Sequence, residues 1–243
     1  MALPPLLIDT PEVAPRRFGL FSVAKPHDLN DGHWQGGIEY EALNCAGGDL
    51  GTIIDACGPI TKVAAANPLF GDYPPIFGYY LHECRAVGGW AEASTRAMRG
   101  YAAREQTFLE KALATQLVGS TAISSDCPEK ALAEAEEYLD STYAGDGIIH
   151  LGSAVASSLG SRLQRQGNHI ETRLGTPVAI GAYGNRVLAT GAVTIRRSAA
   201  TTTPAPLLQA TPATNAIRAL VERTYVIDTD CAAALSGVIT ISC

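Results

Sequence analysis

Residues 90–117 carry the longest regular hydrophobic pattern of the chain, and this pattern limits the fold more than any other feature. Apolar residues recur there at steps of three and four with charged residues between them, which is typical of an amphipathic helix. At about 1.5 Å per residue, such a helix is about 40 Å long. Gly100 lies inside it and costs about 1 kcal/mol relative to alanine, which indicates a close packing contact or a bend. The apolar positions are Ala97, Met98, Tyr101, Ala102, Phe108, Leu109, Ala112, Leu113 and Leu117.

The residues around this helix predict extended structure before it and a second helix after it. Residues 1–44 contain turns and prolines and end in an alternating segment, which predicts an extended arm that ends in a strand. Residues 45–80 predict a glycine-tipped excursion followed by an aromatic strand. Pro128 suits the first turn of a helix, and the pattern after it continues to about Ser141.

The second half of the chain predicts short strands with one small helix among them. Gly147–His150 indicates a buried strand, and the segment from Ser153 to Leu163 indicates a helix with Ser153 as its N-cap. Pro177 has no N–H to donate, so Gly175-Thr176-Pro177 fits the start or the edge of a strand. Further patterns predict β segments at 172–180, 187–197, 223–228 and 234–241, a loop at 199–206 and a short helix at 213–221.

Composition excludes several classes of protein. Hydrophobic residues make up 47% of the 243 residues and charged residues 17%, which is too apolar for disorder and too interrupted by Gly and Pro for a membrane span. The apolar run at residues 1–9 is short and broken by prolines, so no export is expected. A formal charge of −6 argues against a protein that grips nucleic acid through a basic face.

The six cysteines form no Cys-x-x-Cys pair, and their spacing is not that of a zinc site. Reduced, partly buried thiols are the expected state. A disulfide between Cys45 and Cys57, or one between subunits, is the alternative. The remaining cysteines are Cys84, Cys127, Cys231 and Cys243.

No motif predicts a catalytic, cofactor-binding or metal site. Gly152 and Ala154 flank Ser153, so the nucleophile elbow of hydrolases is absent. Gly47–Gly51 lacks the lysine of a phosphate-binding loop. His82-Glu83-Cys84 lacks the second cysteine pair of a deaminase. The acidic residues Glu129, Glu134, Glu136, Glu137 and Asp140 fit the solvated face of the second helix.

Taken in order, the segments resemble the capsid fold of tailed bacteriophages, the Hong Kong 97 type, which encapsulin shells also use. The resemblance covers about residues 16–242 as a match of layout. Its most specific parts are Gly147–His150, Gly175–Val178, and the ending Glu222–Asp228 with Ala232–Ile239.

The resemblance implies an α+β fold and a major capsid protein that is not an enzyme. In that family an arm and an extended loop reach over neighbouring subunits, a spine helix lies along a peripheral domain, and an α/β axial domain packs around five- and six-fold axes. The implied ranges are 1–44 for the N-terminal arm, 45–75 for the extended loop, 76–145 for the peripheral domain with the spine helix at 90–117, 146–199 for the axial domain, and 200–243 for C-terminal strands that return to the peripheral domain.

The resemblance also implies partners and a location. Copies would join through heterologous, ring-forming contacts into the hexamers and pentamers of an icosahedral shell. That shell, the capsid of the virion, would enclose double-stranded DNA without sequence-specific binding, after assembly in the host cytoplasm. Scaffold, portal and decoration proteins are further implied partners, a membrane is not, and no family site residue is carried over.

Three other interpretations stay open at this point. One is an encapsulin-type shell, and another is an accessory virion component such as a decoration or head-completion protein. The third is a zinc- or cysteine-dependent hydrolase that uses His82, Cys84 or Cys57.

Overall fold

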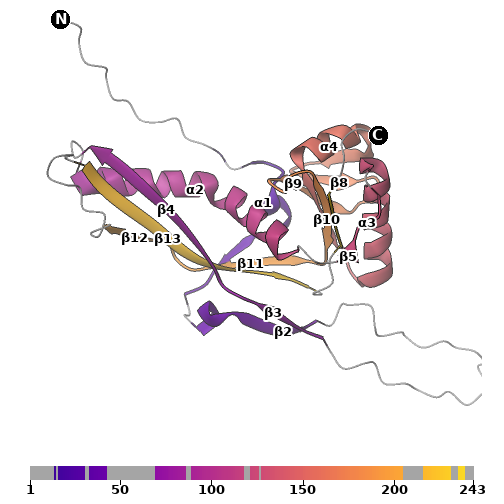
Figure 1. The fold of residues 1–243 in the computed structure, drawn as a ribbon, viewed down its shortest axis with the longest axis horizontal. Helices are drawn as coiled ribbons and strands as arrows, with labels where there is room; N and C mark the ends of the chain where they lie inside the picture. Colours follow the sequence, from indigo (N-terminus) through magenta and orange to yellow (C-terminus); the bar gives the residue numbers. More distant parts are fainter. Residues whose placement is uncertain are drawn as a thin grey trace, which may run out of the picture.

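The computed structural model describes residues 14, 16–30, 33–42, 69–85, 89–117, 121–125, 127–204, 216–230 and 235–238. Within these ranges the chain forms two larger sheets that share one long helix, and a two-stranded ribbon (Figure 1). Most of the predicted extended loop 45–75, namely residues 45–68, lies outside the described residues. None of the helices in the described ranges is long and apolar enough to cross a membrane.

The long helix is α2, Gly89–Gln116, which confirms the prediction from residues 90–117. Gly100 packs against β4 (Ile76–Arg85), because a Cβ at this position would come within 2.5 Å of the Tyr80 ring. The glycine therefore serves the close packing contact that its place in the helix indicated. The buried positions of α2 are Ala93, Ala97, Tyr101, Glu105, Gln106, Leu109, Glu110, Leu113 and Ala114.

The central strand of the five-stranded sheet is β13, Ala216–Thr229. Along one edge it pairs antiparallel with β11 (Val193–Arg197) and then with β12 (Thr201–Pro204). Strand β1 (Pro26–Asp28) adds to β11 in parallel. Along the other edge β13 pairs antiparallel with the whole of β4. One face of this sheet packs on α2 and buries alternate residues of β13, as the period of a strand requires.

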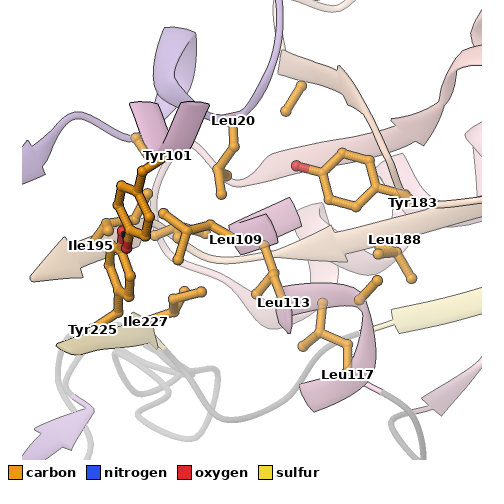
Figure 2. Close-up of a cluster of buried hydrophobic side chains, with 14 of the residues drawn as sticks. Leu20, Tyr101, Leu109, Leu113, Leu117, Tyr183, Leu188, Ile195, Tyr225 and Ile227 are labelled. Atoms are coloured by element: carbon orange, nitrogen blue, oxygen red, sulfur yellow. Dashed lines mark hydrogen bonds between the residues drawn. The ribbon is translucent and has the colours of Figure 1, made fainter. Parts of the chain in front are cut away.

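The seven-stranded sheet holds two short helices on one face and the C-terminal half of α2 on the other. Helices α3 (Pro128–Thr142) and α4 (Ser153–Leu159) pack on Ile149, Val178 and Val187. Leu188 and Tyr183 belong to the cluster on the other side, together with leucines of α2 (Figure 2). In spatial order the strands are β5 (Thr121–Ala122), β14 (Leu235–Val238), β10 (Arg186–Thr190), β6 (Ile148–Gly152), β9 (Pro177–Gly181), β8 (His169–Thr172) and β7 (Leu163–Gln166).

The ribbon consists of β2 (Ile38–Ala42) and β3 (Leu69–Tyr73), which pair antiparallel. Trp34 and Tyr73 pack on Val226, on the face of the five-stranded sheet that points away from α2. Trp34 belongs to the short helix η1 (His33–Gly36) that precedes the ribbon. The other short helices are α1 (Leu20–Val23) and η3 (Gly160–Arg162).

Several predictions of elements are confirmed. Helix α3 begins at Pro128, β6 is buried along its whole length, and β9 begins at Pro177. The mixed α+β fold class is confirmed by the same elements.

Other predictions are wrong, and tertiary pairing is the physical reason. Residues 216–221, part of the predicted helix 213–221, belong to β13 because β4 pairs with all of them and β12 pairs with residues 219–221 on the other edge. The predicted loop 199–206 contains β12, and Pro204 ends that edge strand where a missing N–H does no harm. The single β segment predicted at 187–197 is divided between β10 and β11, which lie in different sheets.

The predicted N-cap is also wrong. Gly152 is the N-cap of α4, and Ser153 is the first helical residue. The Ser153 hydroxyl accepts a hydrogen bond from Arg16 and lies 3.5 Å from the Gly181 carbonyl oxygen. The side chain thus joins the N-terminal segment to the end of β9 and does not cap its own helix.

Packing groups the elements differently from the ranges 76–145, 146–199 and 200–243. Helix α3 packs on the seven-stranded sheet, although it falls within 76–145. Strand β11 lies in the five-stranded sheet and β14 in the seven-stranded sheet. The chain therefore crosses between the two sheets more often than three consecutive ranges allow.

The fully buried Glu110 joins α2 to both the N-terminal segment and the seven-stranded sheet. One carboxylate oxygen accepts a hydrogen bond from the Leu20 amide at 3.2 Å and from the Gln106 side chain at 3.0 Å. The other oxygen accepts from the Ala182 amide at 2.7 Å. Only glycine fits at position 181, because a Cβ there would overlap the Glu110 carboxylate.

We expect Glu110→Gln to lower the free energy of unfolding by about 2–3 kcal/mol, since one of its oxygens becomes an amide donor that faces another donor. Denaturant unfolding of the purified protein measures the change. Glu137→Gln, at an exposed position of α3, is the matched control and should stay within about 0.5 kcal/mol of the unaltered protein. Equal effects of the two substitutions would contradict the structural role of Glu110.

Candidate assembly surface

A buried carboxylate with two arginines connects α2 to the five-stranded sheet. Glu105 accepts hydrogen bonds from Arg197 at 3.0 and 3.1 Å and from Arg223 at 2.7 Å. The Tyr225 hydroxyl donates to the same carboxylate at 2.8 Å and meets the Tyr101 hydroxyl, as Figure 2 shows for the two rings. Because a buried charge needs such partners, this cluster fixes how α2 sits on the sheet.

The network continues to the surface at β1. Arg197 also donates to Asp28 at 2.7 Å. This hydrogen bond, with the positive charges of Arg197 and Arg223, lowers the pKa of Asp28. Strand β1 is thereby held against β11 by side chains as well as by backbone pairing.

His150, which the sequence placed at the end of a buried strand, is fully buried in β6. Its Nε2 lies 2.9 Å from the Thr190 hydroxyl and its Nδ1 lies 3.3 Å from the Tyr183 hydroxyl. Burial lowers the pKa of His150 to about 3. The imidazole is therefore neutral at physiological pH and acts as a packed polar group of the core.

The residues considered for chemistry are not brought together. Ser153 contacts Arg16 and Gly181, whereas His150 contacts Tyr183 and Thr190. Burial and the nearby Arg96 lower the pKa of His82. Within the described residues no three His, Cys, Asp or Glu side chains are placed to hold a metal ion.

The structure describes only some of the cysteines and only some of the residues named for a hydrolase. Cys57 and the side chain of Cys84 lie outside the part of the chain that the structure describes. Cys127 is disulfide-bonded, so the expectation of a free thiol is wrong for this residue.

The acidic face predicted for the second helix borders a groove of about 1160 Å³ between α3 and the turn 172–176. Glu129 pairs with Arg162 at 3.1 Å, and Glu136 accepts a hydrogen bond from Thr176 at 2.5 Å. Glu134 accepts two hydrogen bonds from Ser124, which lower its pKa. These carboxylates are paired separately and do not form a pair of catalytic acids.

Among the described residues of the five-stranded sheet, the large exposed apolar side chains lie on the outer face of β4. Phe77 is 70% exposed, Tyr79 is 74% exposed, and Leu81 follows on the same face. Glu83 continues the row and pairs with Arg218 of β13 at 2.6 Å. Beside Phe77 and Tyr79, a groove of about 470 Å³ extends to Ser198 and Thr224. Large aromatic side chains in a contiguous exposed row mark an interaction surface.

Sequence reasoning named no site residue, and it missed this surface. The aromatic segment at 73–81 was predicted as a strand, and its period of two was the available signal. Which of its two faces stays uncovered depends on where α2 packs, and α2 is sequence-distant from β13, the strand that holds β4 in the sheet.

The two sheets with their shared helix give the chain the fold of phage major capsid proteins. A capsid chain of a native GTA particle is similar over 99% of this chain and 96% of its own, with a TM-score of 0.58 and 11% identity. A chain of Mycobacterium phage Che8 is similar over 97% and 96%, with a TM-score of 0.56 and 14% identity. No protein-family model matches the sequence, and no curated protein matches it either.

A third similar structure is not described as a phage. A virus-like particle from Pyrococcus furiosus is similar over 90% of this chain and 91% of its own, with a TM-score of 0.51 and 11% identity. The fold predicted from the order of segments is thus confirmed along nearly the whole chain.

We expect Glu105→Ala to lower the free energy of unfolding by about 3 kcal/mol or more, because two arginines lose their buried counter-charge. Glu92→Ala on the same helix removes only a surface ion pair with Arg96 and should cost about 0.5 kcal/mol. Thermal or denaturant unfolding of both variants tests the difference. A Glu105 effect as small as that of Glu92 would contradict the role of the buried network.

Because His150 is buried and neutral, we expect the free energy of unfolding to fall in acid. Its pKa of about 3 in the folded chain lies below its ordinary value of 6.5, so the unfolded chain takes up the proton first as pH falls. Stability is therefore complete above pH 6.5 and declines from there toward pH 3, by up to about 1.4 kcal/mol per pH unit.

Unfolding measured at several pH values between 7.5 and about 4.5 checks this dependence. His150→Gln should flatten the curve in that window, because it removes the group that takes up the proton on unfolding. Equal slopes in the unaltered protein and in His150→Gln would refute the assignment.

Proposed function

We propose that this protein is the major capsid protein of a tailed phage and that it self-assembles into the icosahedral shell around double-stranded DNA. The observation that carries the proposal is the extent of the likeness, which takes in nearly all of this chain and nearly all of each capsid chain. If the two proteins shared only a small domain, the similarity would cover only part of each chain.

The division of labour within the chain follows from the packing. We assign the peripheral domain to α2 with the five-stranded sheet, and the axial domain to the seven-stranded sheet with α3 and α4. Residues 1–44 and 45–75 remain the proposed arm and extended loop. The predicted ranges 76–145, 146–199 and 200–243 are adjusted so that α3 and β14 join the axial domain and β11 joins the peripheral domain, which the sheet pairing supports.

The proposed partners are further copies of the chain in hexamers and pentamers, with scaffold, portal and decoration proteins during head assembly. The copies form in the host cytoplasm and end in the virion. The formal charge of −6 suits a wall that encloses DNA without sequence-specific contacts.

An encapsulin-type shell is the second candidate. Its support is the likeness to a chain described as a virus-like particle from Pyrococcus furiosus, a description that names no phage. The two candidates differ in cargo, so nucleic acid recovered from nuclease-treated particles made in the native host separates them.

Assembly itself is the first prediction to test. Negative-stain electron microscopy across a concentration series should show closed shells or rings of five and six copies, since heterologous contacts close into rings. Light scattering on the same samples gives the mass. A monomer at every concentration, including with added crowding agent, would contradict the proposed function.

A further inference from the structure

The N-terminal segment and the hairpin of β7 and β8 form a positively charged surface, the arginine patch, which consists of Arg16, Arg17 and Arg165 with Phe18. The guanidinium carbon of Arg17 lies 5.8 Å from the centroid of the Phe18 ring, and that of Arg165 lies 5.6 Å from the same centroid. All three arginines are exposed. Two segments that are distant in the sequence therefore bring their positive charges to one place.

Hydrogen bonds hold the arginine patch on the seven-stranded sheet. The Ile180 amide donates to the Phe18 carbonyl at 2.7 Å. Arg17 donates to the side-chain oxygen of Asn168, in the turn between β7 and β8, at 3.3 Å. Arg16 donates to the first residue of α4 at 3.3 Å. The positive groups are thus positioned before any ligand arrives, which reduces the entropy lost on binding.

No carboxylate of the described residues balances the charge of the arginine patch. The ion pairs within the described ranges involve other arginines. Like charges at short range repel each other, and a guanidinium group has five N–H donors, more than the hydrogen bonds above use. A bound anion would remove the repulsion and accept from the remaining donors. The arginines that do pair with carboxylates are Arg96, Arg162, Arg196, Arg197, Arg218 and Arg223.

We propose that the arginine patch binds phosphate groups of the DNA inside the shell. This inference rests on the proposed function, since the shell supplies the DNA. The planar guanidinium group offers paired donors that match the oxygens of a phosphate. Such contacts position a duplex without reading its base sequence.

The net charge of the chain sets the strength of this contact. At a formal charge of −6 the protein as a whole does not attract DNA, so binding comes from the local patch and is weak. A few phosphate contacts per copy also make it sensitive to salt. The high concentration of DNA inside a filled shell, together with the many copies of the patch, compensates for the low affinity of each one.

Binding of a fluorescently labelled DNA duplex to the full-length, unassembled chain tests the proposal. Fluorescence anisotropy at salt concentrations between about 50 and 200 mM gives the affinity and its salt dependence. Joint replacement of Arg16, Arg17 and Arg165 by Gln should weaken binding about tenfold or more. The slope of log affinity against log salt should fall by about 0.9 for each phosphate contact that is lost.

The matched control removes the same charge elsewhere on the surface. Arg99, Lys111 and Lys130 are exposed, and their joint replacement by Gln should weaken binding less than about threefold, because the patch stays intact. Melting temperatures check that both triple variants are folded. Equal weakening by the two triple variants, or no duplex binding by the unaltered protein, would overturn the proposal.

Photo-cross-linking tests the contact in DNA-filled particles without removing an arginine. Benzoylphenylalanine replaces Asn168 beside Arg17, and the control carries it at Thr95, an exposed position of α2. After irradiation and nuclease digestion, mass spectrometry should find nucleotide adducts at position 168 and not at position 95. Adducts of equal yield at both positions, or a link from position 168 to a second copy of the chain, would contradict the proposal. Failure to form DNA-filled particles refutes the proposed function instead, and the duplex measurement then decides on the patch.

Discussion

The structure depends on one helix that serves two sheets. The middle of α2 meets the five-stranded sheet, where the Tyr101 and Tyr225 hydroxyls bond to each other. Its C-terminal part meets the seven-stranded sheet, where Ala182 donates to Glu110 and Arg186 donates to the carbonyl of Ala114. A single continuous cluster of buried side chains runs through both contacts (Figure 2). Neither sheet can move along α2 without disturbing the other.

Buried carboxylates set the register of this helix where apolar packing alone would tolerate a slip. Leucine and alanine recur at three- and four-residue steps, so a shift of the helix by one turn would present a similar apolar surface to the sheet. Glu105 and Glu110 do not tolerate such a shift, because each needs specific donors. Glu105 binds two arginines, and Glu110 binds two backbone amides and the Gln106 side chain. A one-turn slip would leave both charges without partners, at a cost well above that of lost apolar contacts.

Local signals in the sequence account for what could be predicted. The helical period at 90–117, Pro128 at a helix start and Pro177 at a strand start were all readable, since each acts within a few residues. The β13 segment 216–221 was misread as a helix because its strand character comes from β4 and β12, which are distant in sequence. The same cause hid Glu105 and Glu110, which look like the polar face of any amphipathic helix until the arginines and amides arrive from elsewhere.

The candidate surface on β4 could not be predicted from the sequence for a related reason. Phe77, Tyr79 and Leu81 alternate with Gly78 and Tyr80, so both faces of β4 look apolar. Gly78 identifies the covered face only in three dimensions, where a Cβ would collide with the rings of Tyr225 and Phe108. The aromatic residues of the opposite face have no such partners within the described chain, and they stay exposed.

An isolated chain gains nothing from a row of exposed aromatic side chains, because such a row invites aggregation. For the proposed shell subunit the same row is useful, since Phe77, Tyr79 and Leu81 lie together on one face of β4, where a neighbouring copy can cover them. The orientation of that copy would depend on how the five-stranded sheet is held relative to the rest of the subunit. Glu105 and Glu110 hold the sheet through α2, so the buried carboxylates would influence the geometry of the proposed contact.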